Sequence, residues 1–399
     1  MAKIKGNAVV GQSGGPTVVI NQSLVGVVKA AREREEIGTI YGAKNGVRGM
    51  RDEDFIELQE LRAEELEAVA NTPSSALGST RDRPDEEYCK QIFEVFRRNE
   101  IHYFFYIGGN DSASTAYILN NLSEKVDYDL RAIHIPKTID NDLPVTDHCP
   151  GYGSAAKFVA LALMGDNLDN KAMPGVKVDV IMGRHTGWLT AAGLLARQAA
   201  DDGPHLIYVP EVPMEISKFI EDVDRVYKAQ GRCLVAVSEG ITDGQGQLWA
   251  KNAQAVMEQD AHGNVTLSGT GLLADFLISE LRRAKPQIKR MRGDTFGYLQ
   301  RCFPSVVSEI DAQEAYTVGQ EAVRYATDWA MDGSVAIRRL SAPSGEYKME
   351  TFLTPLSSVA SKTKTMPAEY CETPGVIKEA FLDYVRPLVG ELPRCAKLF

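Results

Sequence analysis

Two carboxylates lie two positions apart in the segment Lys137-Thr138-Ile139-Asp140-Asn141-Asp142. Placing two carboxylates beside a lysine at the end of a strand is unfavourable unless the carboxylates bind a cation or move a proton. A metal-bridged phosphoryl-transfer site needs both functions, because oxygen ligands hold Mg²⁺ and a base accepts the proton of the acceptor hydroxyl. The segment therefore indicates such a site, with an acidic surface turn as the alternative interpretation.

Two glycine-containing segments are candidate anion-binding loops. In Gly11–Pro16, glycines between a strand and a helix would let backbone N–H groups cradle a phosphate at the start of the helix. This loop is neither Gly-x-Gly-x-x-Gly nor a Walker A loop, so a tight turn is equally compatible with it. The segment Gly78–Arg83 carries two arginines, whose planar side chains suit phosphate. A solvated surface turn is the alternative there.

Three further segments place charged residues beside glycine or tyrosine. In Met182-Gly183-Arg184, the arginine could stabilise the charge of a transferring phosphoryl group, and in Ser238-Glu239-Gly240 the glutamate could accept hydrogen bonds from sugar hydroxyls. Each charged residue alone is a weak signal and is more typical of a structural salt bridge. The segment Arg292–Arg301 suits a sugar phosphate, or else forms an amphipathic strand with a basic rim.

The elements that must position these segments alternate between strands and helices. This alternation predicts mainly parallel sheets covered by helices on both faces, and 399 residues suffice for two of them. The expected strands are 7–10, 39–43, 102–107, 131–136, 178–182, 206–209 and 233–238, and the expected helices are 17–34, 84–99, 112–122, 152–168, 187–200, 217–230 and 270–283. Most candidate segments directly follow a strand. Because ligands bind beyond the carboxyl ends of parallel strands, we expect these segments to converge on one site.

The composition is that of a globular protein with a substantial core, at 44% hydrophobic and 25% charged residues. The net charge of −10 disfavours nucleic-acid partners, so positive charge for an anionic substrate must be concentrated at its site. Six scattered cysteines without a Cys-x-x-Cys pair predict reduced thiols. Without a secretory signal or a long apolar stretch, we expect no membrane association and a cytoplasmic location.

In their order along the chain, these motifs resemble the phosphofructokinase family from Gly11 to about Arg301. The resemblance rests on Gly-Gly at 108–109, Pro-Lys-Thr-Ile-Asp-Asn-Asp at 136–142, Met-Gly-Arg at 182–184, Glu239, and Tyr-Leu-Gln-Arg at 298–301. It implies an α/β fold of two Rossmann-like domains with mainly parallel sheets and the active site in the cleft between them. We expect a phosphoryl-donor domain at 1–138 plus about 252–305, and a sugar-phosphate domain at 139–251 plus about 306–399. No motif is recognised from Tyr325 onward.

The resemblance further implies reversible, Mg²⁺-dependent phosphoryl transfer to the 1-hydroxyl of fructose 6-phosphate, giving fructose 1,6-bisphosphate. By position, Asp140 would be the general base, and Lys137, Asp111 and Arg184 would complete the catalytic set. The sugar phosphate would be held by Thr138, Asp142, Met182, Gly183, Arg184, Glu239, Arg292, Tyr298 and Arg301, and the donor by Gly14, Arg81, Gly109 and Lys137.

Two departures concern the phosphoryl donor. ATP-using members resemble Gly-Gly-Asp-Gly-Ser and Pro-Gly-Thr-Ile-Asp, whereas Asp111 and Lys137 replace glycine here, as in pyrophosphate-dependent members. Asp111 would add bulk and charge where ATP has its α-phosphate, and like charges about 4 Å apart repel by about 4 kcal/mol at an effective dielectric of about 20. Lys137 would supply a compact cation for pyrophosphate. We therefore expect pyrophosphate and phosphate as partners, together with fructose phosphates.

Other activities are alternatives to this interpretation. An ATP-dependent phosphofructokinase would keep the fold and change the donor. A non-catalytic sugar-phosphate-binding regulator is expected to lack the base, yet Asp140 and Asp142 are both present. An NAD-dependent oxidoreductase would need the Gly-x-Gly-x-x-Gly fingerprint, which the sequence lacks.

The resemblance also bears on the metal and on assembly. Asn110 stands where many members have a Mg²⁺-binding aspartate, and its amide oxygen can ligate the metal only without charge. The metal is thus expected to rely on pyrophosphate and on the carboxylates of Asp140 and Asp142. Arg292 matches an arginine that reaches the sugar phosphate of the neighbouring subunit in the family, so a homodimer is expected.

Overall fold

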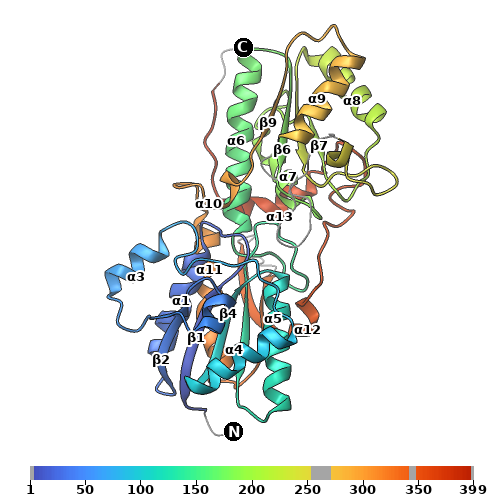
Figure 1. Ribbon diagram of the computed structural model, residues 1–399. Coiled ribbons are helices and arrows are strands. Elements are labelled where there is room, and N and C mark those ends of the chain that lie inside the picture. The colour runs from blue at the N-terminus through green and yellow to red at the C-terminus, as the bar shows by residue number, and fades with distance from the viewer. Residues whose placement is uncertain (1–3, 253–270, 341–346, 397–399) are drawn as a thin grey trace. The chain divides into compact units, whose positions relative to one another are not determined.

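The computed structural model describes residues 4–252, 271–340 and 347–396, which form two compact units (Figure 1). Unit 1 comprises Met1–Tyr152 and Glu309–Lys364, and unit 2 comprises Gly153–Ser308 and Thr365–Phe399. Each unit contains a mainly parallel sheet covered by helices. The predicted α/β class with two sheets is therefore confirmed.

The sheet of unit 1 has seven strands among the described residues, in the order β11-β10-β5-β4-β1-β2-β3. Its five inner strands pair in parallel, whereas β3 and β11 are antiparallel edge strands. Inner strands are buried on both faces, which explains near-continuous apolar runs such as that of β4. The strands are β1 Gly6–Gln12, β2 Ile37–Ala43, β3 Phe55–Glu57, β4 Ile101–Gly108, β5 Arg131–Pro136, β10 Gly333–Leu340 and β11 Lys348–Thr354.

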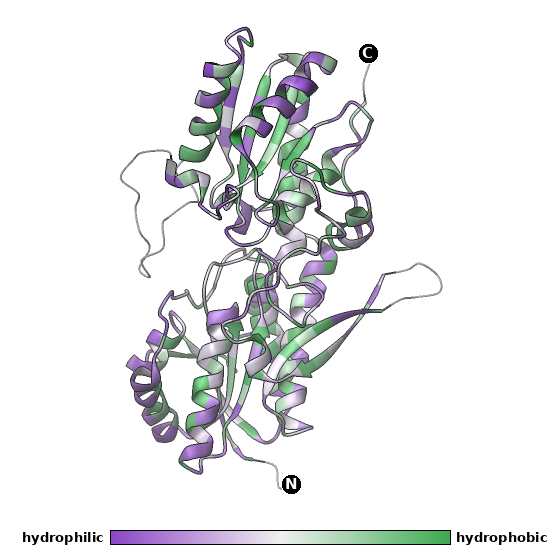
Figure 2. Cartoon of the chain, turned by 90° about the vertical axis from the view of Figure 1, so that its right-hand side faces the viewer, coloured by the Kyte–Doolittle hydropathy of each residue, from purple (hydrophilic) through white to green (hydrophobic). Residues whose placement is uncertain are grey.

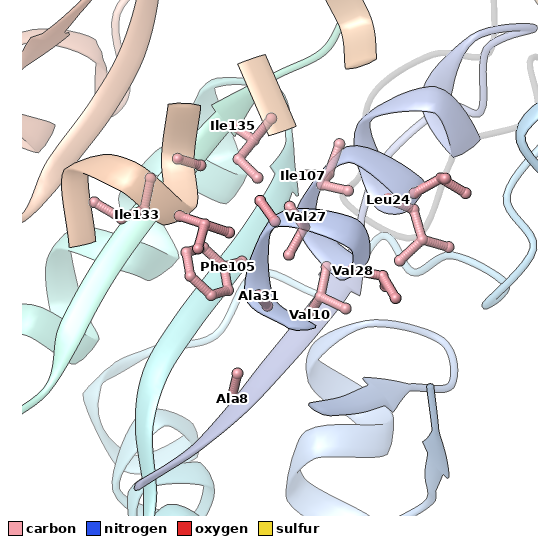
Figure 3. Close-up of a cluster of buried hydrophobic side chains, with 14 of the residues drawn as sticks. Ala8, Val10, Leu24, Val27, Val28, Ala31, Phe105, Ile107, Ile133 and Ile135 are labelled. Carbon is pink, nitrogen blue, oxygen red and sulfur yellow. The ribbon is translucent and has the colours of Figure 1, made fainter. Parts of the chain in front are cut away.

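Helices cover both faces of this sheet. On one face, α1 and α11 pack closely at Gly26 of α1. A Cβ atom there would lie 2.3 Å from the Tyr316 carbonyl oxygen of α11, so the approach requires glycine. The core beneath them contains Val10, Phe105 and Ile133 (Figure 3). The opposite face packs against α2, α4 and α5. The helices of unit 1 are α1 Ile20–Arg32, α2 Val47–Asp52, α3 Ala63–Ala70, α4 Glu86–Arg98, α5 Asn110–Lys125, α11 Glu309–Thr327 and α12 Leu356–Val359.

The sheet of unit 2 is fully parallel among the described residues, in the order β7-β8-β6-β9. Its strands are β6 Val176–Ile181, β7 Leu206–Tyr208, β8 Cys233–Ser238 and β9 Met291–Thr295. Apolar residues concentrate in the strands of both sheets (Figure 2). The surrounding elements are α6 Tyr152–Ala172, α7 Trp188–Ala191, the 3-10 helix Ala192–Ala196, α8 Ile216–Gln230, the 3-10 helix Trp249–Asn252, α9 Leu272–Ala284, α10 Leu299–Cys302 and α13 Ala380–Val389.

Each expected strand and helix corresponds to an observed element, apart from shifted bounds. The segment 187–200, expected as one helix, is instead the short α7 followed by a 3-10 helix that ends at Ala196. The expected helix start at Thr270 lies outside the described residues. Strands β3, β10 and β11 were not predicted, and β9 lies in the segment for which an amphipathic strand was the alternative interpretation.

The division into units differs from the expected domain boundaries. Strand β9 pairs with β6, so the described part of 252–305 belongs to unit 2. Conversely, α11, β10 and β11 belong to unit 1, because β10 pairs with β5. Pairing between strands far apart in the sequence decides both assignments. The cleft between domains stays a prediction.

Two further expectations concern the cysteines and membranes. All six cysteines lie within the described residues and are free thiols, as expected. No described helix combines the length and the apolar content needed to cross a membrane.

Candidate active site

In unit 1, the two candidate anion-binding loops lie against each other. The Ser13 N–H donates to the Ile107 carbonyl at 2.9 Å, which extends the β1–β4 pairing into the glycine loop. Gly14 has a φ of 76°, a left-handed conformation that favours glycine. Its N–H donates to the Thr80 carbonyl at 3.0 Å, and its carbonyl accepts from Ser79 Oγ at 2.6 Å. These bonds bring the arginine-bearing turn to the glycine loop.

Lys137 joins these loops to the Gly-Gly motif. Its buried ammonium donates to the Gly15 carbonyl at 2.8 Å, and its backbone N–H donates to the Gly108 carbonyl at 3.0 Å. A Cβ atom on Gly14 would lie 3.1 Å from Lys137 Nζ, so a side chain there would crowd the ammonium. Gly109 is the N-cap residue of α5, where unpaired N–H groups and the helix dipole favour an anion. The structure thus brings Gly14, Gly109 and Lys137 together.

The arginines of the turn differ in their partners. Arg81 is exposed and makes no hydrogen bond or ion pair with any described residue, which leaves its guanidinium available to a ligand. Arg83 Nε donates to Asp111 Oδ2 at 2.9 Å. From the sequence, both arginines of this turn were expected to suit phosphate, but the pairing of Arg83 with Asp111 was not predicted. Because Arg83 partly neutralises Asp111, the carboxylate is held in place and repels other anions less than a free carboxylate would.

Asn110, at the start of α5, already uses its side chain. Its Oδ1 accepts a hydrogen bond from the Asp111 N–H at 2.8 Å, and its Nδ2 donates to the Lys362 carbonyl at 3.3 Å. One lone pair of Oδ1 remains for a cation. Its role as a metal ligand stays a prediction.

The two candidate catalytic carboxylates follow β5 in a tightly bonded loop. The Asp140 N–H donates to Thr138 Oγ1 at 3.1 Å. Asn141 has a left-handed φ of 56°, and its buried side-chain oxygen accepts from the Cys149 N–H at 3.0 Å. These bonds define the turn that separates Asp140 from Asp142.

The pKa of Asp142 is raised in this loop. Burial, and secondarily the charge of Asp140, raises the pKa of Asp142 from 3.8 to about 7. The two carboxylates therefore interact, and in the absence of a cation one of them retains its proton near neutral pH. Oxygen ligands of this kind suit a hard divalent cation, which would relieve the repulsion. The residues present thus fit a metal held by Asp140 and Asp142.

In unit 2, two strand-end segments support each other at the carboxyl edge of the sheet. The Gly183 carbonyl accepts from Ser238 Oγ at 2.6 Å and from the Gly240 N–H at 3.2 Å. A Cβ atom on Gly240 would lie 1.9 Å from the Arg184 carbonyl oxygen, so only glycine fits there. Met182–Arg184 and Ser238–Gly240 are therefore adjacent, as predicted from their positions after β6 and β8.

The segment that follows β9 joins them through Gln300, a residue for which no role was predicted. Gln300 Oε1 accepts from the Met182 N–H at 3.3 Å. The Arg301 guanidinium lies over the Tyr298 ring at 4.7 Å, and the Tyr298 side chain is 53% exposed. Tyr298 and Arg301 thus lie on the same edge as Glu239, which is buried beside Gly240.

Arg292 does not lie at this edge. In the parallel pairing of β6 and β9, it is opposite Lys177, five residues before Met182. At about 3.3 Å per residue, it lies about 16 Å along the strands from Met182. Within unit 2, Arg292 is exposed and separate from the other predicted sugar-phosphate residues.

Comparisons with known proteins agree with this geometry. A family model described as phosphofructokinase matches residues 7–326. The chain is 54% identical over 387 residues to a Rhodospirillum rubrum protein named pyrophosphate–fructose 6-phosphate 1-phosphotransferase, covering 97% of this chain and 95% of that protein. A Halomonas elongata protein of the same name is 37% identical, covering 98% and 96%. The crystal structure of a pyrophosphate-dependent phosphofructokinase from Nitrosospira multiformis matches with a TM-score of 0.85 and 35% identity, covering 98% and 94%.

We expect Asp142→Asn to stabilise the protein at about pH 8, but not at about pH 4, when divalent cations are absent. Because the folded-state pKa of Asp142, about 7, exceeds its ordinary 3.8, the folded protein holds a proton that the unfolded chain releases. The stability of the wild type therefore falls as the pH rises between these values, whereas asparagine stays neutral. The gain should be about 1–3 kcal/mol, allowing for partial exposure to solvent. Urea unfolding at both pH values measures it, and an equal difference at both would contradict the prediction.

Proposed function

This chain belongs to the phosphofructokinase family, and we propose that it transfers a phosphoryl group from pyrophosphate to the 1-hydroxyl of fructose 6-phosphate. The reaction is reversible and Mg²⁺-dependent, with fructose 1,6-bisphosphate and phosphate as products. The observation that carries the proposal is the buried Lys137 ammonium over the Gly14–Gly15 loop, with Asp111 at the start of α5. Both residues replace the glycines typical of ATP-using members.

Unit 1 supplies the donor-binding and proton-transfer groups. Gly109 binds pyrophosphate through backbone N–H groups at the start of α5, and Arg81 and Lys137 bind it as cations. Gly14, whose own N–H is bonded to the Thr80 carbonyl, contributes by leaving room beside the Lys137 ammonium. Asp140 accepts the proton of the attacking hydroxyl, with its backbone held by Thr138 Oγ1 at 3.1 Å. Asp140 and Asp142 would hold Mg²⁺, which when bound neutralises charge on the phosphate oxygens.

Donor selectivity has a steric and an electrostatic part. Asp111 places a side chain where ATP would need room for its α-phosphate, and the bond to Arg83 at 2.9 Å fixes its position. The pairing reduces the repulsion that a free carboxylate would exert, so we assign more of the selectivity to bulk than to charge. An ATP-dependent phosphofructokinase is the second candidate function. It is disfavoured by these same two residues, Asp111 and Lys137.

Unit 2 supplies groups for the acceptor. Arg184 stabilises the transferring phosphoryl group, and Glu239 accepts hydrogen bonds from the sugar hydroxyls. Thr138 and Asp142 of unit 1 act on the same substrate, together with Met182, Gly183, Tyr298 and Arg301.

We further propose a symmetric homodimer in which Arg292 binds the sugar phosphate of the partner subunit. The register of β9 supports this assignment, since Arg292 lies about 16 Å along the strands from Met182 of its own chain. A cytoplasmic location stays a prediction.

The donor assay tests the proposed function directly. With Mg²⁺ and fructose 6-phosphate, pyrophosphate should support turnover far faster than ATP, and fructose 1,6-bisphosphate with phosphate should drive the reverse reaction. Asp140→Asn is the matched control, because it keeps the shape of the side chain but removes the base. Its kcat should fall by about 10²–10⁴-fold with little change in KM. Comparable ATP activity would refute the proposed donor, and an active Asp140→Asn enzyme would refute the proposed base.

Restoring glycine at positions 111 and 137 should change the preferred phosphoryl donor. Asp111→Gly together with Lys137→Gly should abolish most pyrophosphate activity and allow ATP to bind, and Asp111→Gly alone should allow weaker binding. Asp111→Asn separates the causes, because it keeps the bulk and removes the charge. If bulk dominates, Asp111→Asn should still exclude ATP. Calorimetry measures the binding, and ATP binding to Asp111→Asn as tight as to Asp111→Gly would assign the selectivity to charge.

Mixed dimers test the shared site. Asp140→Ala and Arg292→Ala homodimers should both be nearly inactive. A dimer with one chain of each kind has one site with both lesions and one intact site, so it should recover about half of the wild-type activity. Differential tags isolate this species. Without recovery, Arg292 would act within its own chain or not at all.

A further inference from the structure

The segment Ser361–Lys364, which follows α12, contacts two candidate parts of the active site in unit 1. One is the start of α5, directly after the Gly-Gly motif, and the other is the carboxylate loop, residues 138–149, which carries Asp140 and Asp142. The Lys362 carbonyl accepts from Asn110 Nδ2 at 3.3 Å, at the start of α5. The Lys364 N–H donates to the Asp142 carbonyl at 2.7 Å. A stretch more than 200 residues away in sequence therefore connects the Gly-Gly motif to the carboxylate loop.

The Lys364 side chain holds the same loop at a second point. Its ammonium donates to the carbonyls of Thr146 at 3.0 Å and Asp147 at 2.8 Å. That part of the loop is also bonded to β10, since the Asp147 N–H donates to the Ile337 carbonyl at 2.8 Å and Thr146 Oγ1 accepts from the Ile337 N–H at 2.9 Å. Lys364 thus bonds the loop at two points that both follow the turn at Asn141, namely Asp142 and Thr146–Asp147.

Apolar packing holds the segment in this place. Val359, at the end of α12, is buried with Ala113 of α5 and with Leu143 and Cys149 of the carboxylate loop. Because α5 and the loop share this small core, Lys364 starts from a fixed backbone. Its two side-chain bonds are therefore directed rather than made by a freely rotating surface lysine.

We propose that Lys364 is a positioning residue for phosphoryl transfer, acting through the loop that carries Asp140 and Asp142. Its ammonium fixes the far side of the loop, so that the turn at Asn141 presents both carboxylates in one orientation. A displacement of about 1 Å at a catalytic group can reduce the rate by about 10²-fold, so two bonds that fix a loop are sufficient to affect kcat. The inference about kcat rests on the proposed function, whereas the inference about loop order rests only on the contacts.

Lys364→Met and Lys362→Met are a matched pair for the kinetic test. Both remove one lysine charge from the same short segment, but Lys362 is exposed and uses only its carbonyl in the bonds described above. Lys364→Met should lower kcat by about 10–100-fold while the KM values change less than about threefold, and Lys362→Met should match the wild type. Lys364→Arg keeps a cationic donor and should restore most of kcat. An unchanged kcat in Lys364→Met, or a change in KM alone, would overturn the proposal.

Hydrogen exchange tests the loop without any substrate. In Lys364→Met, amides within residues 138–149 should exchange faster than in the wild type, while the amides of β4 stay protected. Unchanged exchange throughout the loop would overturn the positioning role even if activity fell. If Lys364→Met does not fold, the same two measurements on Lys364→Gln decide. A wild type inactive with pyrophosphate would refute the proposed function instead, and the exchange result would still stand.

Discussion

The donor half of the candidate site depends on the bond between the Lys137 ammonium and the Gly15 carbonyl. A buried ammonium must be hydrogen-bonded, and this carbonyl provides an acceptor at 2.8 Å. The close approach leaves little room for a Cβ atom at Gly14, and Gly14 is in turn bonded to Ser79 and Thr80. One cation thereby determines which residues the first loop tolerates and where the arginine-bearing turn lies.

The parallel pairing of the strands determines where Lys137 lies. Gly108 pairs with Pro136 at the ends of β4 and β5, and Gln12 pairs with Ile107 at the ends of β1 and β4. The residues that follow these strands must therefore emerge at one edge of the sheet. In unit 2 the same rule groups the segments after β6, β8 and β9, and it separates Arg292, because that residue precedes the strand ends.

Local patterns predicted the parts of the fold and site that depend on local sequence. The strands before Gly108, Lys137 and Met182 are apolar runs followed by glycine or a charged residue, so their positions could be predicted from the sequence. Bonds between residues far apart in the sequence could not be predicted. The Arg83–Asp111 pair, the Gln300 bond to Met182 and the pairing of β10 with β5 depend on tertiary structure, and no periodicity in the sequence encodes them. The wrong domain boundaries have the same origin, since β9 and β10 join sheets begun far earlier in the chain.

The carboxylate loop is built at the expense of stability. Burial is the first cause of both the raised pKa of Asp142 and the lowered pKa of Lys364, so each group is shifted toward its neutral form. If the attraction between the two groups dominated, both pKa values would move in the opposite directions. In this loop, the attraction between Asp142 and Lys364 does not offset the cost of burying their charges. Such shifted pKa values are typical of functional sites. A cation bound by Asp140 and Asp142 would favour the charged carboxylates, so ligand binding and folding stability are coupled through these residues.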